Sequence, residues 1–180
     1  MESLRGNLLI ASPALWDPNF RRTVVLVGHH DDEGAVGVVL NRASEVAVDE
    51  AAPAFSDLVG DESVVFVGGP VQPEAAVVVA DFEDPEEAGV LAFGSIGFLS
   101  GEADPEDVAG VRRARLFAGY AGWGAGQLEE EVDEGSWILE PALPEDVFAA
   151  EPDGLWRSVL RRKGREFELL ALMPVDPSLN

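Results

Sequence analysis

The sequence predicts an α/β protein with α+β character, in which a few helices flank a mixed, strand-rich sheet to form a single compact unit. Three observations support this class. Apolar, β-branched runs outnumber segments of helical periodicity, and several of them follow one another without an intervening helix. Hydrophobic residues make up 47% of the 180 residues, enough to build a core. Because consecutive strands do not fit a purely alternating parallel sheet, we expect a mixed one.

The predicted strands begin near the N-terminus. Residues 7–11, 23–28 and 35–40 are apolar runs, and the polar turn between the last two indicates a hairpin. Two prolines and an aspartate predict a loop between the first two. Further strands are expected at residues 64–67, 75–80, 89–93, 115–118, 137–139 and 167–172.

Fewer segments have helical spacing. The apolar residues of segment 48–59 predict a helix, with Pro53 in its first turn, where the missing N–H does no harm. One helical turn is expected at residues 105–109, and a helix is expected to begin at 127–132. A last helix is predicted to follow Asp153 as its N-cap and to end in three cations before Gly164.

The charge of the chain is strongly negative and unevenly distributed. The net charge is −22, and residues 43–111 contain sixteen carboxylates but no Lys or Arg. Binding to nucleic acid requires Lys and Arg at the phosphates, so this charge argues against direct nucleic-acid binding and against an anionic membrane surface. The basic residues lie in four places: Arg5 with Arg21 and Arg22, then Arg42, then Arg112, Arg113 and Arg115, and finally residues 157–165.

Composition also limits cofactor chemistry and location. The chain has no cysteine and two histidines, which excludes disulfides, thiolate zinc sites and His-rich metal sites. The N-terminal apolar run is too short for a signal peptide, and the sequence has no membrane-length apolar stretch. We therefore expect a cytoplasmic protein, and the sequence does not name a cofactor.

Two glycine-rich segments are candidates for ligand binding. Residues 119–126 lie between a predicted strand and a predicted helix, where backbone amides can hold phosphate. The segment lacks the spacing of a phosphate-binding motif, and the three consecutive glutamates that follow would repel an anion, so a tight, closely packed turn is the simpler interpretation. Gly68 and Gly69 follow a buried strand and either line a pocket or form a turn.

No catalytic motif stands out. His29 and His30 precede three acidic residues, an arrangement that suits a general base or metal site but is more typical of a polar hairpin turn. The segment around Ser95 lacks the spacing of a hydrolase nucleophile elbow. The sequence therefore leaves catalysis open and favours a protein that is not an enzyme.

Residues 6–42, 67–71, 117–137 and 169–174 together resemble the AlgH/YqgE family of bacterial proteins, in the same order along nearly the whole chain. The resemblance implies one AlgH/YqgE-like domain over residues 1–180, a compact α/β fold with a mixed sheet and a cytoplasmic location. It implies no established activity, although some members carry the label of transcriptional regulator. Relatives often place a histidine in the strand matched here by residues 75–81, and its absence weakens any scheme that uses two histidines.

Two functional hypotheses remain. The first is a non-catalytic binding or regulatory protein with a protein partner. The second is a small-molecule site for a nucleotide or phosphate, or an unrecognised enzyme, near the two glycine segments. The residues predicted to bind the ligand match the family at polar, aromatic or glycine positions: Arg22, His30, Asn41, Arg42, Gly68, Gly69, Tyr120, Trp123 and Gln127.

Overall fold

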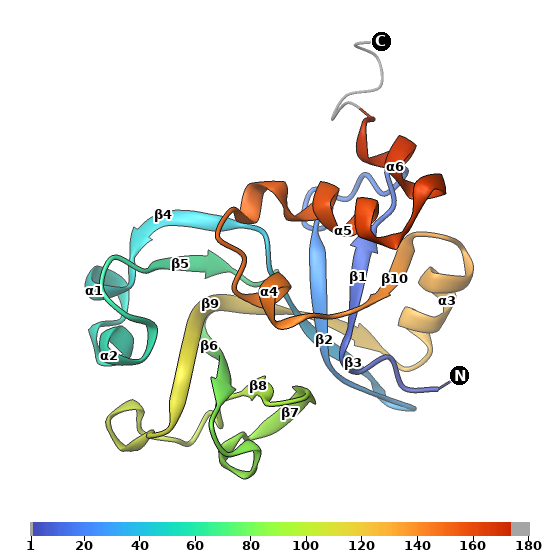
Figure 1. Ribbon diagram of the computed structural model, residues 1–180. Helices are drawn as coiled ribbons and strands as arrows, with labels where there is room; N and C mark the ends of the chain where they lie inside the picture. Colours follow the sequence, from blue (N-terminus) through green and yellow to red (C-terminus); the bar gives the residue numbers. More distant parts are fainter. Residues whose placement is uncertain (1, 174–180) are drawn as a thin grey trace.

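Ten strands form the body of the protein in the computed structural model, which describes residues 2–173 (Figure 1). The strands are β1 (Asn7–Ala11), β2 (Val24–Asp31), β3 (Gly34–Val39), β4 (Ala43–Ala47), β5 (Val64–Val67), β6 (Val71–Phe82), β7 (Val90–Phe93), β8 (Ile96–Phe98), β9 (Val111–Gly124) and β10 (Trp137–Pro141). At 14 residues, β9 crosses the molecule and joins the half that holds β1–β3 to the half that holds β4–β8 (Figure 1). It is the structural link between the two halves.

The strand order confirms the predicted mixed sheet. The main path runs β10-β1-β2-β3-β9-β6-β8-β7, and β5 joins it through β9 while pairing with β4 on its other side. The pair β5–β9 is parallel, and the other pairs are antiparallel. The predicted hairpin is the β2–β3 pair, whose ends meet at Asp31 and Gly34.

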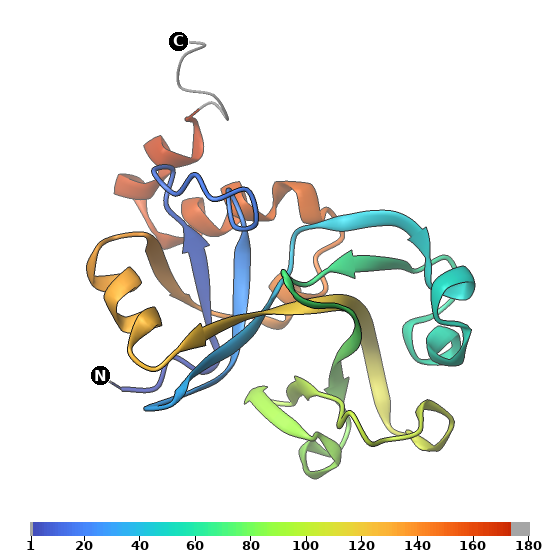
Figure 2. The same ribbon diagram turned by 180° about the vertical axis from the view of Figure 1, so that it is seen from behind.

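Short helices connect and cover the strands. They are α1 (Val48–Ala51), α2 (Ser56–Val59), α3 (Gln127–Asp133), α4 (Pro144–Val147), α5 (Leu155–Lys163) and α6 (Arg165–Ala171), with 3₁₀ turns at Pro53–Phe55, Pro85–Glu87, Pro105–Asp107 and Pro152–Gly154. Figure 2 shows α5 and α6 over one side of the β1–β3 half, while α1 and α2 lie at the far end of the other half.

Both faces of the β1–β3 half are buried. Leu8 and Ile10 of β1 pack in one cluster with Trp156 of α5, whereas Leu9 and Ala11 pack in a second cluster beneath α3. Side chains alternate between the faces of a strand, so burial on both faces requires a continuous apolar run. This explains the continuous apolar runs of residues 8–11 in β1 and 24–27 in β2, which made both strands recognisable from sequence.

Several strand predictions were too short. The strand predicted at residues 115–118 is part of β9, which continues to Gly124, so most of the glycine-rich segment is strand and the predicted tight turn is wrong. Close packing explains the glycine: a Cβ on Gly119 would lie 2.6 Å from the carbonyl oxygen of Gly69. The strands β4 and β8 were not predicted, because β4 is largely exposed and has no continuous apolar run, and β8 has three residues.

Three helix-related predictions were also wrong. Segment 48–59 is not one helix, since it is divided into α1, a 3₁₀ turn and α2 around Pro53. Asp153 is not an N-cap: it lies in the 3₁₀ turn before α5, which has Gly154 at its N-cap and no side-chain cap. The predicted strand at residues 167–172 is mostly α6, whose exposed Leu169 belongs to no sheet.

Candidate functional site

Three of the predicted ligand-binding residues meet at the loop before β2. Asn41 accepts a hydrogen bond from the Val24 amide at 2.9 Å and donates one to the Arg22 carbonyl at 2.9 Å. These bonds hold Arg22 in a left-handed backbone conformation, with a φ of 55°, that non-glycine residues rarely adopt. Arg42 donates to the carbonyls of Asn19 and Pro18 at 2.6 and 2.9 Å. The three side chains therefore organise this loop.

The guanidinium of Arg22 lies over the ring of Trp156, 4.4 Å from its centroid, and also donates to the carbonyl of Met173. Burial lowers the pKa of Arg22, and the nearby charge of Arg157 lowers it further. Because arginine stays protonated at neutral pH even so, this contact connects the loop to α5 as a cation–π interaction.

His30 lies in a second place, between the N-terminal segment and α3. Its Nδ1 accepts the Leu4 amide at 2.8 Å, so the proton of the neutral ring is on Nε2, which donates to Glu129 at 2.6 Å. A cavity of about 280 Å³ opens beside this pair and is lined by Ser3, Asp31 and Asp32 as well. The remaining lining is thus acidic or neutral, and both ring nitrogens are already bonded.

Trp123 and Gln127 stabilise the same end of the molecule. The indole N–H groups of Trp123 and Trp137 donate to one oxygen of Glu131 at 3.3 and 3.1 Å, and Phe20 stacks on Trp123. Gln127 accepts the Gly124 amide at 3.0 Å at the start of α3. These contacts fix α3 against β9 and β10.

Gly68, Gly69 and Tyr120 lie in a third place, where the chain passes closest to β9. A Cβ on Gly68 would lie 2.3 Å from the Gly119 carbonyl oxygen, and one on Gly69 would lie 2.2 Å from the Tyr120 carbonyl. Tyr120 packs against the cluster beneath α5. The nine predicted residues therefore lie in three separate places, and the close approach of two backbones explains the glycines.

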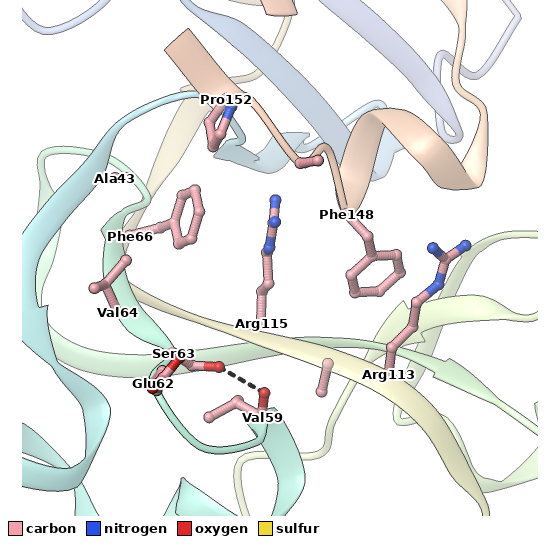
Figure 3. Close-up of a pocket in the computed structure, with 12 residues that line it drawn as sticks. Ala43, Val59, Glu62, Ser63, Val64, Phe66, Arg113, Arg115, Phe148 and Pro152 are labelled. Atoms are coloured by element: carbon pink, nitrogen blue, oxygen red, sulfur yellow. Dashed lines mark hydrogen bonds between the residues drawn. The ribbon is translucent and has the colours of Figure 1, made fainter.

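A larger cavity, of about 490 Å³, opens between β5, β9 and the chain after α4, and it contains none of the nine predicted residues (Figure 3). We call it the Arg113–Arg115 cleft. The β4–β5 side contributes Ala43, Val59, Glu62, Ser63, Val64 and Phe66. The remaining lining comes from Arg113, Ala114 and Arg115 of β9 and from Phe148, Ala150 and Pro152.

Arg115 holds one wall of the cleft in place. Its guanidinium donates to the carbonyls of Val147 and Ala149 at 3.1 and 2.6 Å and lies 4.7 Å from the ring centroid of Phe66. Figure 3 shows the side chain extending between Phe66 and Phe148. Burial lowers the pKa of Arg115, and the charge of Arg113 lowers it further.

The wall is anchored a second time through α4. Both carboxylate oxygens of Asp146 accept from Arg162 of α5 at 2.8 Å, and one of them also accepts the Leu143 amide at 2.8 Å. The hydrogen bond to Asp146 raises the pKa of Arg162. The segment after α4 is thus held between two arginines, one on α5 and one on β9.

Arg113 is the less constrained cation of the cleft. It lies on the same face of β9 as Arg115 because the two are two residues apart, and it lies 4.5 Å from the ring centroid of Phe148. Its nearest carboxylate oxygen, on Asp81, is 3.9 Å from Nε. Within residues 2–173 its two terminal nitrogens make no hydrogen bond, so their donors can meet an anion.

The sequence contained a signal for this cleft that the predicted set did not include. Arg112, Arg113 and Arg115 are the first cations after the base-free segment 43–111, and their alternation along a strand places two of them on one face. Phe66 and Phe148 gave no such signal, because only the fold brings them beside those arginines.

Residues 8–168 match the AlgH-like family. This chain belongs to that family. A UPF0301 protein of Streptomyces avermitilis is 47% identical over 189 residues, covering 100% of this chain and 97% of that protein. A relative from Mycobacterium tuberculosis is 41% identical over 181 residues, covering 97% of this chain and 90% of that protein. Neither name states an activity.

Two solved structures share the fold. A crystal structure of a Corynebacterium diphtheriae protein superposes with a TM-score of 0.85 at 32% identity, over 95% of this chain and 93% of that chain. The solution structure of AlgH from Pseudomonas aeruginosa has a TM-score of 0.71 at 29% identity, over 96% and 95%. Both likenesses extend over the two halves of the sheet, and the recognised resemblance is confirmed.

None of the helices within residues 2–173 has the length and apolar character needed to cross a membrane. The same residues contain no group of three or more His, Asp or Glu side chains arranged to hold a metal ion.

Proposed function

We propose that this protein is a non-catalytic binding protein that takes a small organic anion in the Arg113–Arg115 cleft. One observation carries the proposal: a cavity of about 490 Å³ has two arginines on one strand face, each over an aromatic ring, in a chain of net charge −22. Cavities of this size are typical of small-molecule sites.

The two arginines have different roles in this proposal. Arg113 supplies free terminal N–H donors, which bind carboxylate or phosphate in a planar, two-point arrangement. Arg115 spends two donors on backbone carbonyls, so it contributes positive potential and shape. A stacked guanidinium uses its face for the ring and leaves its edge for hydrogen bonds.

The proposal favours binding over catalysis because the polar lining offers no paired acid and base. The hydroxyl of Ser63 donates to the carbonyl of Val59 at 2.6 Å, and the only carboxylate in the lining is that of Glu62. In the same proposal the protein is cytoplasmic and a protein partner senses the bound state. Nucleic acid is disfavoured as a partner because segment 43–111 carries sixteen carboxylates and no Lys or Arg.

The test is a thermal-shift and calorimetric screen with inorganic phosphate, dicarboxylates and nucleotides. A ligand present at about one hundred times its Kd stabilises by about 2.7 kcal/mol, which corresponds to a rise of about 5–11 °C for a chain of this size. Arg113→Gln should remove that rise. Arg161→Gln is the matched control, because it makes the same charge change on the exposed surface of α5.

Two results would count against the proposal. The first is that no anion in the panel stabilises the protein at about 5 mM. The second is that Arg113→Gln and Arg161→Gln weaken binding equally, which would show that overall charge, rather than the cleft, attracts the ligand.

A further inference from the structure

Glu62 is an unusual residue at the edge of the Arg113–Arg115 cleft. It lies in the turn between α2 and β5 with a φ of 66°, in the left-handed region that favours glycine or asparagine. A glutamate in this conformation costs free energy relative to those residues. Such outliers gather at functional sites, where the surrounding structure maintains the strained backbone.

The described part of the fold makes no use of the Glu62 carboxylate. The side chain is exposed, and within residues 2–173 it takes part in no hydrogen bond and no ion pair. In Figure 3, Glu62 and Ser63 lie on one side of the cleft, Arg113 lies on the other, and Arg115 lies between them. The cleft is therefore bipolar, with an acceptor on one side and cations on the other.

We propose that the ligand is a nucleoside monophosphate, an inference that rests on the proposed binding function. The phosphate meets the free donors of Arg113, the ribose hydroxyls donate to the Glu62 carboxylate, and the base packs on the apolar lining near Pro152. A carboxylate that accepts from ribose hydroxyls is a recurrent device in nucleotide sites.

Charge favours the monophosphate over longer phosphate chains. A diphosphate or triphosphate brings further negative charge that needs several cations, whereas both terminal nitrogens of Arg115 already donate to backbone carbonyls and, within residues 2–173, those of Arg113 do not. The carboxylate of Glu62 and the net charge of −22 would repel that extra charge. Glu62 is thus the residue that selects a ligand with hydroxyl donors opposite its anionic group.

The experiment measures calorimetric affinities for AMP, GMP, CMP, UMP, 2′-deoxyAMP and inorganic phosphate. We expect at least one ribonucleotide to bind with an affinity at least tenfold above that of phosphate. If that ribonucleotide is AMP, 2′-deoxyAMP should bind about tenfold more weakly than AMP. Removing one hydrogen bond to a charged group typically has this effect. For any other preferred base, the matching 2′-deoxy compound replaces 2′-deoxyAMP.

Two variants separate recognition from backbone strain. Glu62→Gln keeps the strained backbone and removes the charge, whereas Glu62→Gly relieves the strain and removes the side chain. Both variants should lower the affinity for the ribonucleotide at least tenfold and leave the affinity for phosphate within twofold of that of the native protein. The Tm should stay equal in Glu62→Gln and stay equal or rise in Glu62→Gly. Asp61→Asn, on the preceding acid outside the lining, should change neither quantity.

The inference is overturned if both Glu62 variants bind the ribonucleotide with affinities within twofold of that of the native protein. It is also overturned if the ribonucleotide and its 2′-deoxy counterpart bind with equal affinity. In either case an anion whose binding still depends on Arg113 would leave the proposed binding function standing. Absence of any Arg113-dependent binding would instead remove the proposed function, and the ligand assignment with it.

Discussion

Replacing Arg115 by lysine tests whether this residue holds the cleft wall. Arg115 donates to two carbonyls, those of Val147 and Ala149, at 3.1 and 2.6 Å and lies over Phe66. Lysine carries a compact ammonium instead of a planar fork, so it spans two carbonyls less well and stacks less well on the ring. The same substitution at Arg113 removes no hydrogen bond of the described fold, so Arg113→Lys is the matched control.

The expected cost follows from those contacts. A hydrogen bond to a charged group contributes about 1.5–3 kcal/mol, and an exposed cation–π contact contributes about 0.5–1 kcal/mol. Because the side chain is only half-buried, solvent reduces both contributions, so Arg115→Lys should lower the free energy of unfolding by about 2 kcal/mol. For a chain of this size the Tm should fall by about 4–8 °C.

Urea denaturation followed by far-UV circular dichroism measures this change. Arg113→Lys should cost less than about 0.5 kcal/mol, as is usual for an exposed surface substitution. Equal costs for the two variants, both below about 0.5 kcal/mol, would refute the assignment of Arg115 as the residue that supports the wall. The cleft would then owe its shape to the anchoring of α4 on α5.

Three other positions give predictions of different kinds. Gly69→Ala should lower the free energy of unfolding, measured by urea denaturation, by about 3 kcal/mol or more, because the new Cβ would lie 2.2 Å from a backbone carbonyl. The control Gly126→Ala has open space around the new Cβ and should lower it by about 1 kcal/mol. Equal losses in the two variants would contradict the close approach at Gly69. Glu131→Ala should lower the free energy of unfolding by about 2–4 kcal/mol because two buried indole N–H groups lose their acceptor. Its control Glu130→Ala, on the exposed side of α3, should lower it by less than about 0.5 kcal/mol. The pKa of Asp31 should lie below its ordinary value of 3.8 because a neighbouring imidazole bonds its carboxylate. The resulting stabilisation is present above about pH 4 and is lost as the pH falls through the lowered pKa, so a carboxyl NMR titration with a midpoint at or above 3.8 would contradict it.

The elements that sequence reasoning placed correctly are those whose pattern is local. The hairpin of β2 and β3 follows from two apolar runs around a polar turn, and α5 follows from apolar residues spaced along one helix face. The segment that forms α6 was predicted as a strand because a short apolar run does not by itself distinguish the two states. Only the absence of a strand partner in the described sheet decides between them.

The candidate site shows the same division. The nine residues predicted to bind a ligand include Arg22, Asn41 and Arg42, and the structure places these three together, but their hydrogen bonds go to the loop that they organise. A residue that forms a binding site and a residue that holds a loop have the same polar side chains. Which one a residue is depends on whether its donors are already bonded, and that is a property of the fold.

By itself the sequence determined the strand-rich mixed fold, the family, and a strongly negative net charge with one segment that has no Lys or Arg. These follow from composition, from the alternation of side chains along strands and from matched motifs, all of which are properties of neighbouring residues. The tertiary structure decided where the cleft lies. Phe66 and Phe148 are distant in the chain and meet at Arg113 and Arg115 only because β5 pairs with β9 while α4 is held over that strand.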